Sequence, residues 1–153
     1  MTADAMLDTP IANDASAQTM AIILAAGRGS RMQSDQPKVL LPALGRPLVA
    51  HVIDALLATG IQKIVLVVGH QQELVKTELN EFSNLIFVTQ LEQLGTGHAV
   101  QMCGTQLKQH SGPVLVVTGD SPLIQPESIK SLLAEFQAIQ ASCILGSLHH
   151  ANP

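Results

Sequence analysis

Two glycines and two arginines lie close together directly after the first apolar run of the chain. Residues 24–32 read Leu-Ala-Ala-Gly-Arg-Gly-Ser-Arg-Met, which sets Arg28 and Arg31 beside Gly27 and Gly29. Glycines let backbone N–H groups approach an anion with no Cβ in the way, and the arginines add positive charge. The segment is therefore a candidate phosphate-binding loop. The alternative at this point is a tight turn from a strand into a helix, with both arginines in solvent.

Two common phosphate-binding motifs do not describe this loop. The dinucleotide-binding fingerprint requires a third glycine where this chain has Met32. The Walker A motif requires Gly-Lys-Ser or Gly-Lys-Thr, and neither tripeptide occurs in the sequence. The pattern alone therefore indicates an anion and leaves the kind of nucleotide open.

A single carboxylate ends a later apolar run. Residues 114–117 are Val-Leu-Val-Val, and Thr118, Gly119 and Asp120 follow. An apolar strand that ends in Gly-Asp presents its carboxylate at the edge of a sheet, where a hard oxygen ligand can hold Mg²⁺ against triphosphate oxygens. Asp is also common in Asp-Ser-Pro turns. From the residues alone, the metal-binding and the turn interpretations of Asp120 are both open.

A polar turn follows the third apolar run of the chain. Residues 90–99 read Gln-Leu-Glu-Gln-Leu-Gly-Thr-Gly-His-Ala. Thr96 is a good helix N-cap, and a helix start is a further position that favours an anion. The amides of Gln90 and Gln93 both donate and accept hydrogen bonds, which suits the edge of a pyrimidine base, although a solvated turn accounts for them as well. His98 is expected to cap or to pack.

Five short apolar runs predict the strands that position these groups. Each is apolar without interruption, and most are rich in β-branched residues, which is typical of strands covered on both faces in a parallel sheet. The runs are residues 21–24, 64–68, 85–88, 114–117 and 143–145.

Helical periodicity fills the stretches between these runs. An apolar stripe that opens at Pro47 and stops before Gly60 predicts one helix, and a stripe opened by Pro126 predicts another. Weaker helical patterns cover residues 71–79 and 96–107. Alternating strands and helices predict an α/β fold with a mostly parallel sheet and helices on both faces. The carboxyl ends of its strands then share one edge, where ligands bind.

Composition and charge narrow the class of protein. The chain has 153 residues, 46% of them hydrophobic, which suits one domain, and its core must be aliphatic because Trp and Tyr are absent. The net charge of −4 argues against a protein that binds nucleic-acid backbones. Cys103 and Cys143 have no partners at zinc-ligand spacing, so both are expected to be reduced, buried thiols.

The N-terminal segment differs from the rest of the chain. Residues 1–19 are rich in Ala, Thr, Asp and Ser without periodicity, which predicts a disordered tail ahead of an ordered portion at 20–153. The segment lacks the basic and apolar regions of a signal peptide, and no run reaches the roughly 18 apolar residues of a membrane span. We therefore expect a cytoplasmic protein without a membrane span or a nucleic-acid partner.

The order of these motifs resembles a known family. The loop at 24–32 is followed by Pro-Lys-Val-Leu at 37–40, then by the string at 90–99, then by Asp120 after its strand. From Ala21 onward, nearly the whole chain is similar to the N-terminal part of the nucleotidyltransferase domain of bacterial bifunctional N-acetylglucosamine-1-phosphate uridyltransferases. The resemblance implies a Rossmann-like three-layer α/β/α nucleotidyltransferase fold of the glycosyltransferase-A type, here truncated.

The resemblance also implies an activity and the residues that perform it. The implied enzyme is a Mg²⁺-dependent transferase that converts UTP and N-acetylglucosamine 1-phosphate to UDP-N-acetylglucosamine, a precursor of peptidoglycan and lipopolysaccharide, and releases pyrophosphate. Arg31 and Lys38 are the implied catalytic residues, Asp120 the metal ligand, and Thr118 and Gly119 the substrate contacts. The implied nucleotide-binding residues are Leu24, Ala25, Ala26, Gly27, Gly29, Lys38, Gln90, Gly95 and Thr96.

The sequence also departs from that family. Thr118 stands where the family commonly has Tyr, Ser121 where it often has an aliphatic residue, and Ser30 where it has Thr. The family's domain is longer than this chain, so its sugar-binding residues and second metal ligand are expected beyond Pro153. Two alternatives follow: a related nucleotidyltransferase that uses another sugar phosphate or base, and a catalytically incomplete nucleotide-binding fragment.

Overall fold

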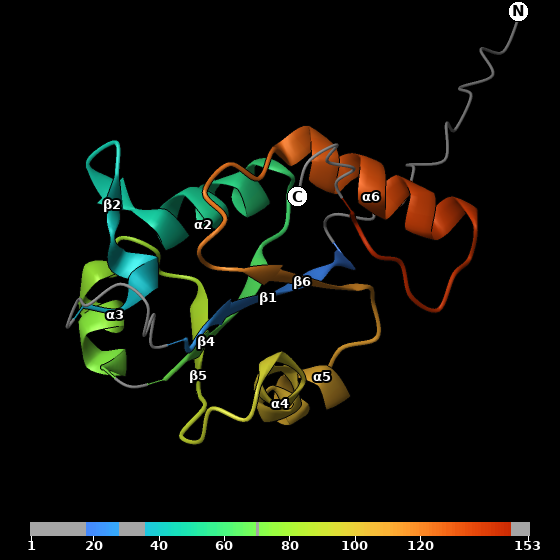
Figure 1. Cartoon of the computed structure of the whole chain (residues 1–153). Helices are drawn as coiled ribbons and strands as arrows, with labels where there is room; N and C mark the ends of the chain where they lie inside the picture. The colour runs from blue at the N-terminus through green and yellow to red at the C-terminus, as the bar shows by residue number, and fades with distance from the viewer. Residues whose placement is uncertain (1–17, 28–35, 70, 148–153) are drawn as a thin grey trace, which may run out of the picture.

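The computed structural model describes residues 18–27, 36–69 and 71–147, and a parallel sheet lies at their centre. Four strands form this sheet in the order β5-β4-β1-β6 (Figure 1). They are β1 (Met20–Ala25), β4 (Lys63–Val68), β5 (Leu85–Thr89) and β6 (Val114–Thr118). The chain thus leaves β1 towards β4 on one side and later returns to the other side of β1 as β6.

Helices cover both faces of this sheet (Figure 1). One face carries α2 (Leu48–Ala58), α3 (Gln72–Glu78) and α6 (Pro126–Ala138). The opposite face carries α4 (Thr96–Met102) and α5 (Gly104–Lys108). The α/β class, the parallel sheet and the three layers predicted from the sequence are therefore confirmed.

The connection between the end of β1 and α2 spans residues 26–47. Within the described residues it contains a 3-10 helix, η1 (Lys38–Leu40), and an antiparallel hairpin of β2 (Pro42–Ala43) and β3 (Arg46–Pro47). This connection carries one of the predicted catalytic residues, so its packing decides where that residue lies.

Apolar side chains on β1 fill both layers of the core. Ala21, Ile23 and Ala25 pack beneath α2, α3 and α6, whereas Met20 and Ile22 pack against α4 and α5. All five residues are at most 4% exposed. Because both faces of the strand are covered, it shows a continuous apolar run instead of an alternating pattern.

Four of the five predicted strands are confirmed, each within one residue of its predicted ends. The strand predicted at 143–145 is wrong, because this segment has no regular structure and the side chains of Cys143 and Leu145 are exposed. A run of only three apolar residues forms a strand only where a neighbour pairs with it, and no described strand does so here.

The two cysteines have different environments. Both are free thiols, as expected, but only Cys103 is buried, and its burial raises the pKa of its thiol. The expected burial of Cys143 is wrong, since that residue follows α6 on the irregular segment.

The predicted helix ends are largely confirmed. Pro126 occupies the first turn of α6, and Gly60, with a φ of 92°, follows the end of α2. Pro47 is not the first residue of α2 but precedes it by one, because it still pairs within the β2–β3 hairpin. The helix predicted at 96–107 is two helices, separated at Cys103.

In the part of the chain that the structure describes, no helix is long and apolar enough to cross a bilayer. Of the tail predicted at 1–19, residues 1–17 lie outside the described residues.

Candidate active site at the carboxyl edge of the sheet

The three sequence motifs meet at one edge of the sheet. All four strands are parallel, so their carboxyl ends share that edge. Ala26 follows β1, Gln90 follows β5, and Gly119 follows β6. Because β4 and β6 lie on opposite sides of β1, the end of β1 beside β6 is a topological switch point, where open α/β sheets bind their ligands.

An ion pair lies at this switch point. Lys38 Nζ donates to Asp120 Oδ2 across 2.6 Å, although the two residues are 82 positions apart in the sequence. The Lys38 ammonium holds the pKa of the Asp120 carboxyl below its ordinary value, and the Thr118 hydroxyl adds to this effect, while partial burial opposes it. Asp120 is therefore a carboxylate at neutral pH. Both side chains remain more than a third exposed, at 40% and 34%, so a ligand can reach them.

The backbone around Lys38 is held by buried neighbours. Val39 and Leu40 in η1 are 4% and 3% exposed, and they pack into the core shared with α2. The backbone N–H of Leu48, the first residue of α2, donates to the carbonyl oxygen of Leu41 at 3.0 Å. Lys38 thus stands on a rigid turn, and its ammonium group faces the end of β6.

Gly119 allows the end of β6 to approach this turn. Its backbone N–H donates to the Leu24 carbonyl oxygen at 2.9 Å, which ties the end of β6 to β1. A Cβ at this position would lie 3.1 Å from Val39 Cγ1 and 3.3 Å from Ile23 Cγ2. The small residue therefore brings Asp120 within reach of Lys38. A substrate contact of Gly119 and Thr118 stays a prediction, and the Thr118 hydroxyl lies 2.7 Å from Ser121 Oγ.

The start of the glycine-rich loop is held from two sides. Gln93 Nε2 donates to the Ala26 carbonyl oxygen, which joins the polar turn after β5 to the loop after β1. Gly69, at the end of β4, lies so close that a Cβ there would be 2.7 Å from the same oxygen. Gly27 is exposed, and apart from its chain neighbours no atom of the described residues lies within 4 Å of the position of a Cβ.

Gly69 is not among the site residues predicted from the sequence. A signal for it is present in the sequence, because Gly69 directly follows the apolar run at 64–68, and a glycine in or beside a strand often marks a close approach of two backbones.

Gly69→Ala should displace Ala26 and with it the start of the loop. The clash is with backbone, which cannot rotate away, so we expect a stability loss of about 1–3 kcal/mol and at least about tenfold weaker binding of nucleoside triphosphate. Gly104→Ala is the matched control, since outside its own helix no atom of the described residues lies within 4 Å of its Cβ position, and neither glycine has a positive φ. Urea unfolding and calorimetric titration measure the two effects. Unchanged nucleotide binding by Gly69→Ala would contradict this role.

The polar turn after β5 begins with Gln90, which is buried at the carboxyl edge of the sheet. Its backbone N–H donates to the Val68 carbonyl oxygen at 2.8 Å, and only 3% of the residue is exposed. Gly95 and Thr96 are exposed at the start of α4. The predicted N-cap at Thr96 is wrong: Thr96 is the first helical residue, and Gly95, whose φ is 100°, is the cap. A glycine adopts this φ without strain, so it supplies the turn into the helix.

Asp120 fits magnesium only together with a nucleotide. Among the described residues, no group of three or more His, Cys, Asp and Glu side chains could hold a metal ion. Mg²⁺ in nucleotide-dependent enzymes commonly takes one or two carboxylates, with phosphate oxygens and waters as its other ligands. One ionised, accessible carboxylate at the edge beside the candidate phosphate loop meets that requirement.

Two predicted site residues lie outside the described residues. Gly29 and Arg31 belong to segment 28–35, as does Arg28, so the role of Arg31 stays a prediction. The other predicted residues of the nucleotide site, from Leu24 to Gly27 and from Gln90 to Thr96, lie along the shared edge.

Comparison with known proteins agrees with this fold and site. The family model described as MobA-like NTP transferase domain matches residues 21–150. Curated relatives named bifunctional protein GlmU are 47% identical over 124 residues in an Exiguobacterium species and 47% identical over 133 residues in Bacillus cereus. These alignments cover 81% and 87% of this chain but 27% and 28% of the relatives. The chain thus spans somewhat more than a quarter of their length.

Solved structures share the fold. An inositol-1-phosphate CTP transferase from T. maritima has a TM-score of 0.66 and 29% identity, over 76% of this chain and 48% of that one. HddC from Yersinia pseudotuberculosis, complexed with GMP-PN, has a TM-score of 0.57 and 26% identity, over 65% and 47%. A UDP-glucose pyrophosphorylase complexed with UDP-glucose has a TM-score of 0.67, but its 21% identity shows likeness of fold alone.

Proposed function

We propose that this chain, which belongs to the family of MobA-like NTP transferase domains, is the nucleotide-binding portion of a uridylyltransferase. The reaction transfers UMP from UTP to N-acetylglucosamine 1-phosphate and yields UDP-N-acetylglucosamine and pyrophosphate. The Lys38–Asp120 pair carries the proposal, because it sets a cation and a metal-binding carboxylate together at the switch point, beside the candidate phosphate loop. The similarity to bifunctional GlmU proteins supports the choice of substrates.

The chemistry of this transfer suits the groups at the edge. The attacking oxygen of a sugar phosphate is already anionic near neutral pH, so no side chain has to remove a proton. Catalysis then depends on holding the two phosphates in line and on neutralising the charge that grows on the leaving pyrophosphate. No Ser-His-Asp or Cys-His arrangement is needed.

Each residue has a role in this proposal. Lys38 and Arg31 bind the phosphates, and the backbone around Ala26 and Gly27 lies against the nucleotide. The Lys38 ammonium has three N–H donors, so it can keep its bond to Asp120 while it reaches a phosphate oxygen. Mg²⁺, held by Asp120 and the triphosphate, would supply further positive charge at the leaving group.

The proposed product sets the biological context. UDP-N-acetylglucosamine is consumed in the synthesis of peptidoglycan and lipopolysaccharide, so the enzyme would work in cell-wall biogenesis in the cytoplasm. The net charge of −4 agrees with small anionic substrates held by a few local cations and not with a nucleic-acid partner.

A related nucleotidyltransferase is the second candidate. The T. maritima structure is named a CTP transferase for inositol 1-phosphate, and HddC is complexed with a guanine nucleotide analogue, so similar folds are paired with other bases and sugar phosphates. A catalytically incomplete nucleotide-binding fragment is the third, because the chain spans little more than a quarter of its GlmU relatives.

A nucleotide panel separates these candidates. Pyrophosphate release is measured with N-acetylglucosamine 1-phosphate, Mg²⁺ and UTP, CTP, GTP or dTTP in turn, and binding of the same nucleotides is measured by calorimetry. Preference for UTP in both assays supports the proposal. Equal use of CTP or GTP would favour the second candidate, and selective binding of UTP without pyrophosphate release would favour the third.

A further inference from the structure

The side-chain amide nitrogen of Gln90 has two hydrogen-bond partners. Its Nε2 lies 3.1 Å from the Gly95 carbonyl oxygen and 2.9 Å from His98 Nδ1. An amide nitrogen carries two N–H groups, so these two contacts use its whole capacity as a donor. Since Gln90 is almost fully buried, water cannot readily replace either partner.

The Gly95 carbonyl determines which way this amide faces. A carbonyl oxygen only accepts hydrogen bonds, so the amide nitrogen, and not its oxygen, must lie against Gly95. A rotated amide would set two acceptor oxygens about 3 Å apart in a buried site.

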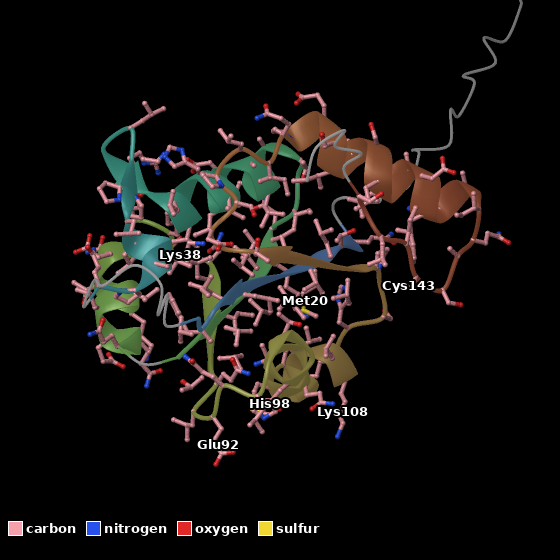
Figure 2. All side chains as sticks on the ribbon, viewed as in Figure 1. Met20, Lys38, Glu92, His98, Lys108 and Cys143 are labelled. Atoms are coloured by element: carbon pink, nitrogen blue, oxygen red, sulfur yellow. The ribbon has the colours of Figure 1, made fainter. Side chains whose placement is uncertain are left out.

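The same orientation determines the state of His98. Because the second N–H of Gln90 points at His98 Nδ1, that ring nitrogen must accept, and the proton of the neutral imidazole lies on Nε2. His98 is on the first turn of α4, on the face of the sheet opposite Lys38 (Figure 2).

We propose that His98 is a positioning residue that makes Gln90 an acceptor towards the base. With both N–H groups occupied by Gly95 and His98, Gln90 has only its oxygen Oε1 left for a ligand. That oxygen favours a base with an N–H donor on its pairing edge, as uracil has at N3. Cytosine has a bare, accepting nitrogen at N3, which is repelled by the oxygen. The pair Gln90–His98 thus selects UTP over CTP, an inference that rests on the proposed uridylyltransferase function.

His98→Leu and His98→Asn test this role. Leucine removes the acceptor, so one Gln90 N–H loses its partner and the amide can turn towards the ligand. We expect UTP binding about tenfold weaker and the preference for UTP over CTP about tenfold smaller, because tenfold corresponds to one hydrogen bond of ordinary strength. In asparagine, Oδ1 can take the place of Nδ1 as acceptor, so we expect this variant to keep both properties within about threefold.

A matched control separates this effect from a general loss of stability. His110→Leu removes a histidine that bonds the Pro113 carbonyl oxygen at 3.0 Å, after the end of α5 and away from the carboxyl edge. It should leave the ratio of UTP to CTP affinity unchanged. Thermal unfolding of all three variants gives their stability independently of nucleotide. Where turnover is measurable, His98→Leu should raise KM for UTP and leave kcat within about twofold, since Lys38 and Asp120 are untouched.

Loss of the UTP preference in His98→Leu, with its retention in His98→Asn and His110→Leu, supports the proposal. If the wild type prefers UTP and the His98→Leu variant keeps the same preference for UTP over CTP, the positioning role of His98 is overturned and the proposed function stands. The same holds if asparagine fails as leucine does. A wild-type chain that binds UTP and CTP equally overturns the proposed function as well.

Discussion

Replacing Lys38 with alanine should lower kcat about a thousandfold while it weakens UTP binding less than about fivefold. The ammonium group adjoins the carboxylate expected to hold magnesium, so its charge acts where negative charge grows on the departing pyrophosphate. In the proposed complex, contacts to the base and to the loop backbone would hold the nucleotide in the ground state without this group. An interaction that strengthens only in the transition state appears in kcat and not in affinity.

The measurement combines steady-state pyrophosphate release with calorimetric titration of UTP. Lys76→Ala is the matched control, because Lys76 also pairs with a carboxylate, Glu73 at 2.8 Å, but lies on α3 outside the row of strand ends. Lys38→Arg keeps the charge with a wider head group and should recover part of the rate. If Lys38→Ala lost affinity for UTP and kept its turnover, the catalytic role would be wrong.

Asp120→Asn should abolish the effect of magnesium on nucleotide binding. The wild-type carboxylate is ionised and accessible, and it repels a triphosphate unless a divalent cation lies between them. The amide of asparagine removes both the repulsion and the strong metal ligand. We therefore expect Asp120→Asn to bind metal-free UTP at least as tightly as the wild type does, with no gain when Mg²⁺ is added. We also expect kcat/KM about a thousandfold lower.

Calorimetric titration of the protein with UTP, once with Mg²⁺ and once with a chelator, measures UTP affinity with and without the cation. Asp54→Asn is the matched control. Asp54 lies on α2, and its Oδ2 forms an ion pair with Arg46 Nη1 at 2.5 Å, so this substitution also removes the charge of a paired carboxylate. The loss of that pair should affect stability slightly and the magnesium dependence not at all. A wild-type gain from Mg²⁺ that persists in Asp120→Asn would show that the cation is held elsewhere.

The order of the motifs and their common edge could be predicted from the sequence. Continuous apolar runs indicate strands covered on both faces, and such strands are parallel, so whatever follows them collects at the carboxyl edge. The residues after β1, β5 and β6 are expected at one edge for this reason, whereas their individual roles are implied by the family resemblance. The run at 143–145 is apolar but forms no strand, because an apolar pattern indicates burial, whereas a strand also needs a neighbour to pair with, and no described strand pairs there.

Contacts within the site could not be predicted in the same way. Nothing local to Gly69 indicates that Ala26 lies against it, because that contact depends on β4 pairing beside β1. From the residues alone, the two glutamines of the polar turn are equivalent as readers of a base, and only the family resemblance singles out Gln90. In the fold, Gln93 donates to the loop backbone, whereas Gln90 is held by Gly95 and His98.

The sequence by itself determined the strands, the helices on both faces and the edge at which the loop, Gln90 and Asp120 gather, because burial and periodicity are properties of short segments. Only the tertiary structure decided that Lys38 bonds Asp120 and that the Gln90 amide is held in one orientation. The first contact joins residues 82 positions apart and exists only because β6 lies beside β1 in the sheet order. The second depends on a carbonyl and an imidazole that the turn into α4 brings to one buried nitrogen. Pairings of this kind are set by strand order and turn geometry, which the pattern of one segment does not contain.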